Sequence, residues 1–179
     1  MRKSGFTLIE MIAVLLILAI LSAATTAGLS SAREKAWRTQ AREICRNVCV
    51  AWNAYLLDAR RFPKAIPGKG QKLEATYSNM MWIVDASKNE FQRIYLEISD
   101  DEKTDGLRDH WIDPKASDPK AEKGQLILFS LDTDYDNQVD NPYPNASDPP
   151  LPKAKATSLA WSKGNPRRAK RNDNPIVVW

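Results

Sequence analysis

Apolar and polar positions divide the chain into two contrasting parts. An uninterrupted apolar run extends from Met11 to Leu21, and Glu10 is the only ionisable residue between Phe6 and Leu29. A helix that is apolar on every side avoids water, and about 20 such residues span a bilayer. The pattern therefore predicts that residues 6–29 form a helix buried in a membrane or in the core of an assembly.

A second pattern follows, in which apolar residues keep to one face of a helix. The opposite face carries three arginines, and Pro63 cannot continue a helix. We expect residues 30–62 to be the amphipathic half of one long helix that ends near Arg61 and packs its apolar stripe on a small domain. The stripe consists of Trp37, Ala41, Ile44, Cys45, Val48, Trp52, Tyr55, Leu56 and Ala59, and the arginines are Arg38, Arg42 and Arg46.

Residues 63–179 are predicted to form a globular head. Short apolar runs late in the chain favour strands, and the spacing of Phe91, Ile94, Tyr95 and Ile98 favours a helix. Helices followed by strands indicate an α+β fold in which a small antiparallel sheet covers the stripe of the long helix. The expected elements are a loop at 63–77, helical patches at 78–98, a charged turn at 100–106 and strands at 125–131, 157–162 and 176–179.

Glu10 distinguishes three interpretations of the N-terminus: a secretory signal peptide, a plain membrane anchor and a leader that precedes an assembling helix. A carboxylate at the bilayer centre costs roughly 2.5–3.5 kcal/mol or more, so it needs a partner. A disposable signal peptide gains nothing from such a residue. The simplest alternative places Glu10 near a helix end, where its side chain reaches the lipid headgroups.

The segment from Lys3 to Glu10 resembles the leader junction of type IV pilins and pseudopilins. This resemblance implies that a prepilin peptidase removes the leader, residues 1–5, by cutting between Gly5 and Phe6, and then N-methylates Phe6. Residues 6–29 would then be the transmembrane and filament-core helix. Glu10 would pair with the Phe6 ammonium of a neighbouring subunit, because a buried charge is tolerated only when paired, and this pair would set the register of assembly.

Segments in the second half resemble the major pseudopilins of type II secretion systems. They follow the family's order at 109–114, 127–134, 159–164 and 172–174, and Trp179 closes the chain. Each match is weak alone, but together with the N-terminus they cover the whole chain. A long adhesive pilin with a C-terminal disulfide loop is disfavoured because the cysteines for that loop are missing.

The resemblance also implies a calcium site in the last loop. Its ligands would be the Leu159 carbonyl, Ser162 and Asp173. However, Asn165 replaces the expected acid and Pro166 follows it. Four cations also lie in this loop, whereas calcium prefers several oxygen ligands with net negative charge.

A second candidate calcium site comes from spacing alone. Asp132, Asp134, Asp136 and Asp140 stand at positions 1, 3, 5 and 9 of an EF-hand-type loop, and Asn137 can take the left-handed conformation usual for glycine there. The bidentate acid at position 12 is missing. The alternative is an acidic, solvated turn between strands.

Composition excludes several other functions. The net charge is +4, and loss of Arg2 and Lys3 would leave 24 basic and 22 acidic residues, or +2, so no nucleic-acid partner is expected. The sequence has a single histidine and no glycine-rich phosphate loop, so it offers no catalytic set of residues. We therefore do not expect this chain to be an enzyme. Cys45 and Cys49 are predicted to be small buried residues, and the alternative is that they form a disulfide with another chain.

These observations predict a structural subunit of a type II secretion pseudopilus. The resemblance implies an inner-membrane protein with one span and a periplasmic head. Its partners would be copies of itself, the prepilin peptidase, an assembly ATPase, a platform protein and minor pseudopilins. The alternatives are a type IV pilin for surface pili, adhesion or DNA uptake, an anchored periplasmic binding domain that never polymerises, and an enzyme on an anchor.

Overall fold

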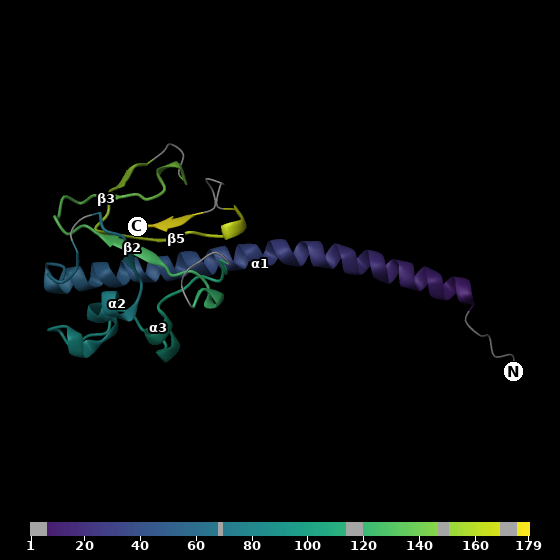
Figure 1. The fold of residues 1–179 in the computed structure, drawn as a ribbon, viewed down its shortest axis with the longest axis horizontal. Helices are drawn as coiled ribbons and strands as arrows, with labels where there is room; N and C mark the ends of the chain where they lie inside the picture. Colours follow the sequence, from purple (N-terminus) through teal and green to yellow (C-terminus); the bar gives the residue numbers. More distant parts are fainter. Residues whose placement is uncertain (1–6, 68–69, 114–119, 147–150, 169–174) are drawn as a thin grey trace. The chain divides into compact units, whose positions relative to one another are not determined.

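The computed structural model describes residues 7–67, 70–113, 120–146, 151–168 and 175–179. The chain divides into two compact units, Met1–Ala36 and Trp37–Trp179. The second unit, called the head below, holds the sheets and the shorter helices (Figure 1). Each unit is described by itself.

Helix α1 (Leu8–Ala59) contributes to both units. In the first unit its apolar side chains are exposed, from Leu8 at 81% to Leu21 at 57%. In the head the apolar stripe faces the core, as the helical spacing predicts. Its members Ala41, Cys45, Val48, Trp52 and Tyr55 are buried, and its other members are partly buried. Cys49 and Ala51, outside the predicted stripe, are buried as well.

The core of the head forms where this stripe meets a sheet. Trp52 is fully buried, and its ring lies 5.8 Å from that of Phe129 in the sheet and 6.0 Å from that of Phe62, just beyond α1. Helix α1 ends at Ala59 because Arg60 turns into the left-handed region, with φ of 59°, while its N–H still bonds to the Leu56 carbonyl.

A four-stranded antiparallel sheet lies along α1 in the order β1-β2-β5-β6 (Figure 1). A separate pair joins β3 to β4. The sheet confirms the α+β class, with the late strands close to their predicted positions. The strands are β1 (Leu73–Glu74), β2 (Leu128–Leu131), β3 (Val139–Asp140), β4 (Lys153–Ala154), β5 (Ser158–Ser162) and β6 (Ile176–Val178).

Two sequence predictions in the head were wrong. Residues 89–98 follow α2 (Tyr77–Val84) but are not helical, because Asn89 folds them into a loop. The Asn89 side chain accepts bonds from the N–H groups of Phe91 and Arg93 and donates to the Trp82 carbonyl. Tyr95 still packs on the core, but as part of this loop.

The predicted charged turn is instead helix α3 (Asp100–Asp105). Ser99 caps its start by accepting a bond from the Glu102 N–H, and the Glu102 carboxylate bonds back to the Ser99 N–H at 2.8 Å. This capping box stabilises even a single turn and a half of helix. Gly106 closes the helix with a φ of 79°.

Candidate functional site

The N-terminal motif meets helix α1 at Thr7 and Glu10. Gly5 and Phe6 lie outside the described residues. The Glu10 carboxylate accepts bonds from the Thr7 N–H at 2.8 Å and from the Thr7 hydroxyl at 2.7 Å. The Glu10 N–H bonds back to the Thr7 hydroxyl at 3.4 Å. Thr7 and Glu10 therefore form a capping box that starts α1.

This cap gives Glu10 a role within its own chain. Its carboxylate satisfies a backbone N–H that the first helical turn leaves unpaired and lies at the positive end of the helix dipole. The sequence analysis missed this role. The Thr-x-x-Glu pattern just before an apolar run was the signal that would have revealed it.

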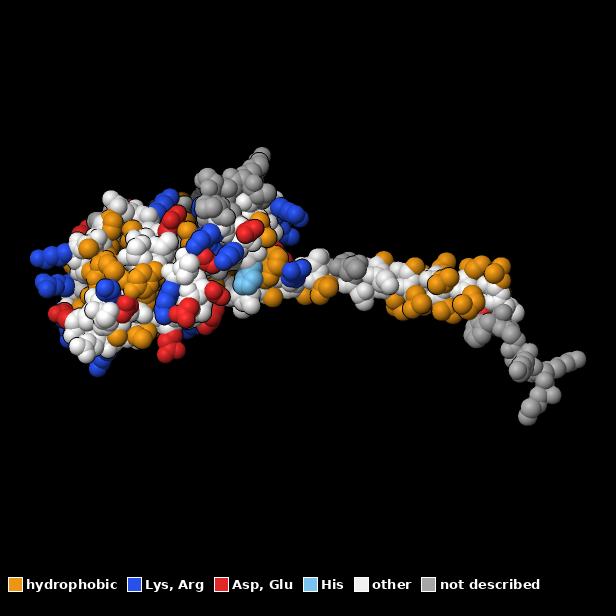
Figure 2. Space-filling model, turned by 60° about the horizontal axis from the view of Figure 1, so that its bottom comes forward, with side chains coloured by type: hydrophobic (Ala, Val, Ile, Leu, Met, Phe, Trp, Pro, Cys, Tyr) orange, Lys and Arg blue, Asp and Glu red, His pale blue; other side chains and the backbone are white. Residues whose placement is uncertain are grey.

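The surface of α1 from Leu8 to Leu21 is largely apolar and exposed. Orange side chains gather on the part of the helix toward its N-terminal end in Figure 2. Exposed apolar surface of this extent marks a site of contact with lipid or protein. Within the described residues, no helix meets the length and hydropathy required of a membrane span.

The acidic loop after β2 brings three of its four predicted carboxylates together. Oxygens of Asp132, Asp134 and Asp136 lie within 4.8 Å of one another. The Asp132 carboxylate accepts bonds from the N–H groups of Asn137 at 2.6 Å and Asp136 at 3.3 Å. Asn137 has a φ of 61°, which confirms the predicted left-handed residue in this turn. Asp140 lies outside the cluster.

The cluster has features that a hard cation would favour. Asp132 is 1% exposed, whereas Asp134 and Asp136 are exposed. Burial raises the pKa of the Asp132 carboxyl above its ordinary value, and the adjacent Asp134 carboxyl raises it further. A cation would relieve this repulsion, and carboxylate oxygens are the ligands calcium prefers. Three carboxylates supply part of the six to eight oxygens it takes.

The turn that holds these carboxylates is fixed to the segment just beyond α1. The Tyr135 hydroxyl accepts a bond from the Phe62 N–H at 2.8 Å, and the two rings stack 6.1 Å apart. Asp140 lies in β3, where its backbone pairs with Lys153. A cation here would therefore be held by one turn that contacts Phe62, just beyond α1.

Two segments of the pseudopilin resemblance meet in the head through a buried carboxylate. The Ser162 hydroxyl donates to Asp109 at 2.6 Å, and both residues are buried. The other Asp109 oxygen accepts bonds from the N–H groups of Trp111 and Gln125, each at 3.0 Å. Burial raises the pKa of the Asp109 carboxyl, and the Ser162 bond opposes that rise.

The Asp109–Ser162 contact involves one of the ligands predicted for the other calcium site, which consists of Leu159, Ser162 and Asp173. Its member Ser162 is engaged with Asp109, and its hydroxyl also accepts a bond from the Gly164 N–H at 2.9 Å. Leu159 lies within β5, opposite Ser130 of β2. Asp173 lies outside the described residues, so this ligand set stays a prediction.

The N-terminus matches one family model. Residues 1–26 match the Prokaryotic N-terminal methylation motif. The match covers the predicted cleavage junction and Glu10. The structure adds the long helix and antiparallel sheet of a pilin-like fold. The chain is type IV pilin-like. The motif implies processing by a peptidase, anchoring in the inner membrane through the N-terminal helix and assembly into a filament.

The other comparisons add no relative of this pilin-like chain. No curated protein matches it. No solved structure matches it either.

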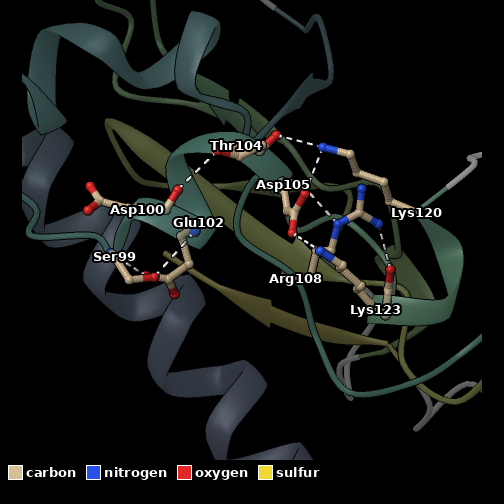
Figure 3. A network of polar contacts seen from close by, with 9 residues as sticks. Ser99, Asp100, Glu102, Thr104, Asp105, Arg108, Lys120 and Lys123 are labelled. Carbon is tan, nitrogen blue, oxygen red and sulfur yellow. Dashed lines mark hydrogen bonds and ion pairs between the residues drawn. The ribbon is translucent and has the colours of Figure 1, made fainter.

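The pilin-like head also contains an ion-pair network that the sequence analysis missed. Asp105, at the end of α3, contacts the ammonium groups of Lys120 at 2.7 Å and Lys123 at 2.5 Å (Figure 3). Arg108 donates to the carbonyls of Asp105 and Gly124. The network ties α3 to residues 120–124 and so holds the Asp109 segment between them.

Both cysteines of the pilin-like chain are buried on α1 and free. Burial raises the pKa of the Cys45 thiol, and it raises the pKa of Cys49 to about 11. The prediction that they are small buried residues is confirmed. Their exposed fractions are 0% and 4%, and Cys49 lines a groove between α1 and β6.

Proposed function

We propose that this pilin-like chain is a structural subunit of a type II secretion pseudopilus. Prepilin peptidase cuts between Gly5 and Phe6 and methylates Phe6, and the N-terminal helix then polymerises to drive protein export. The methylation motif over residues 1–26 carries this proposal. The exposed apolar surface of α1 supports it, because such a surface requires a membrane or neighbouring helices to cover it.

The head supports a secretion pseudopilin over an adhesive pilin. The Asp109–Ser162 contact joins two segments that resemble major pseudopilins, which gives those weak matches a shared structural reason. Both cysteines of the sequence are on α1, so no C-terminal disulfide loop is present.

Glu10 would act at two stages of this function. Before assembly its carboxylate is satisfied by Thr7, which lowers the cost of holding it near an apolar environment. On assembly it exchanges this cap for the Phe6 ammonium of a neighbouring subunit. A subunit in the wrong register would leave that ammonium unpaired.

Export in living cells tests this proposal. The full chain is expressed in a strain that has a type II secretion system but lacks its major pseudopilin. We expect the wild-type chain to restore export and Glu10→Gln to be cleaved but not assembled. Glu43→Gln is the matched control, because Glu43 is an exposed glutamate of α1 within the head. Assembly of E10Q at wild-type levels would contradict the proposal, and surface fibres without export would favour a surface pilin.

We also propose that the turn with Asp132, Asp134 and Asp136 binds calcium and stabilises the head. The cluster of three carboxylates supports this. Calorimetric titration of the full chain with Ca²⁺, and with Mg²⁺ for comparison, measures it. The double variant D134N/D136N should lose binding, whereas Asp101→Asn, at an exposed position of α3, should retain it. Equal calcium binding by D134N/D136N would exclude this turn.

A further inference from the structure

A groove on the head combines positive charge with apolar surface. It has a volume of about 500 Å³ and lies between α1 and β6. Arg42 and Arg46 line it together with Val50 and Trp179, which are 58% and 50% exposed. Within the described residues, no hydrogen bond or ion pair engages either arginine. The groove therefore presents two free cations beside uncovered apolar surface.

A second surface of the head has the opposite charge. Ile94 is 55% exposed, and the exposed acids Glu97, Asp100 and Asp101 follow it within seven residues of chain. Lys103 pairs with Asp100 at 3.0 Å, and Glu102 lies beside it in α3. Residues 94–103, called the acidic ridge, therefore carry four acids and one base, or −3. The side chains of the groove include two arginines and no acid. The two surfaces are opposite in charge, and each offers an exposed apolar side chain.

The groove and the ridge lie on different sides of the head. The loop before the ridge bonds to α1 at Asp58, through Arg93 at 2.9 Å. Arg42 and Asp58 are 16 residues apart, which at about 100° per residue places them about 160° apart around the helix axis. Figure 1 agrees, with α2 and α3 on one side of α1 and the sheet on the other. Red side chains gather along one edge of the face in Figure 2.

We propose that the groove binds the acidic ridge of a second copy of this chain. Because the two surfaces differ, the contact is heterologous, so each copy leaves one groove and one ridge free for the next copy. A contact of this kind does not close as a dimer, and it extends into a filament when the rotation between successive copies does not close a ring. The inference rests on the proposed filament function and adds a head-to-head contact to the packing of the N-terminal helices.

Disulfide trapping in assembled filaments tests this contact. The full chain carries V50C and I94C together, one in the groove and one at the ridge, while the native cysteines stay buried. After mild oxidation we expect a ladder of covalent multimers on a non-reducing gel. The control variant combines I94C with Lys153→Cys, which lies at an exposed position of β4. The single variants V50C and I94C should give no ladder.

Charge reversal supplies a second readout. Arg46→Glu in the trapping variant should lower the ladder yield roughly fivefold, the effect of losing about one exposed pair. Because each chain supplies both surfaces, adding Asp101→Arg to R46E should restore part of the yield. Arg168→Glu, at an exposed arginine outside the groove, is the matched control and should leave the yield unchanged.

The outcomes separate this contact from the function on which it rests. Filaments that sediment and support export but give no ladder overturn the contact and leave the proposed function intact. A dimer from V50C alone indicates groove-to-groove docking and also overturns the contact, as does an equal ladder from the control pair. A chain that is processed but forms no filament overturns both.

Discussion

Replacing Ser162 with alanine should destabilise the head through two lost hydrogen bonds. The Ser162 side chain is fully buried, donates to the Asp109 carboxylate at 2.6 Å and accepts from the Gly164 N–H at 2.9 Å. Alanine removes the donor and the acceptor together and leaves both partners in place. The Asp109 carboxylate and the Gly164 N–H both lie inside the head, where water does not replace the lost bonds.

The magnitude follows from the type of each bond. A hydrogen bond to a charged group contributes about 1.5–3 kcal/mol, and a buried N–H without a partner costs about 1–3 kcal/mol. The two effects share one side chain and are not additive, so we expect a loss of about 2–4 kcal/mol. Such a loss is a large fraction of the stability of a domain of this size.

Ser130 is a matched control on the neighbouring strand. It is 3% exposed, and its hydroxyl has no hydrogen-bond partner among the described residues. Ser130→Ala should therefore be neutral or slightly stabilising. Urea unfolding of the full chain in detergent, followed by tryptophan fluorescence, gives both free energies of unfolding. A loss for S162A no greater than that for S130A would refute the reasoning.

The pH dependence of the S162A deficit adds a further check. Burial raises the Asp109 pKa in the folded head, and loss of the Ser162 bond raises it further. A raised folded pKa gives stability that is present below the ordinary value of 3.8 and is lost as the pH rises through the folded pKa. The deficit of S162A should therefore be larger at neutral pH than in acid.

Three other substitutions test local features of the head by the same unfolding measurement. Gly124→Ala should cost about 3 kcal/mol or more, because a Cβ would lie 1.8 Å from the Asp109 carbonyl oxygen and φ is +105°; a loss below that of S130A plus experimental error would contradict this. Two lysine ammonium groups lower the folded pKa of Asp105 to about 2, so its stabilisation is lost as the pH falls from the ordinary 3.8 through 2. Asp105→Asn should therefore reduce the loss of unfolding free energy over this pH range, and an unchanged loss would exclude Asp105 as its source. Arg60→Gly should stabilise by about 0.5–1 kcal/mol, because relief of the left-handed conformation at φ 59° (roughly 1–2 kcal/mol) exceeds the added freedom of glycine in the unfolded chain (about 0.4–1 kcal/mol); a loss of stability would show that the Arg60 side chain matters more than its backbone.

The sequence predicted the parts of the fold that depend on long, regular patterns. The apolar stripe of α1 extends over many turns, so its buried face and its end near Pro63 were recognisable. Strands β2, β5 and β6 were found because each is a short apolar run. Strands β1, β3 and β4 have only two residues each, which is too few for a period to show.

Local side-chain bonds account for the wrong predictions. Asn89 bonds to several backbone groups and replaces the helix that the apolar spacing of 91–98 predicts. The capping boxes at Thr7 and Ser99 follow a recognisable four-residue pattern, so those helix starts were within reach of the sequence.

The site was predictable only where spacing along the chain decides proximity. The aspartates at 132, 134 and 136 lie in one turn and come together as their spacing indicates, whereas Asp140, which the sequence grouped with them, lies outside the cluster. Asp109 and Ser162 are 53 residues apart and meet only because the strands pair, so no local pattern links them. The same holds for Asp105 and its two lysines.

The mature N-terminus tests the central claim most directly. The full chain is expressed with and without a prepilin peptidase, and its N-terminal peptide is identified by mass spectrometry. We predict that, only when the peptidase is present, the chain begins at N-methylated Phe6. An uncut chain, or one cut near Ala24 by a signal peptidase, would contradict the account.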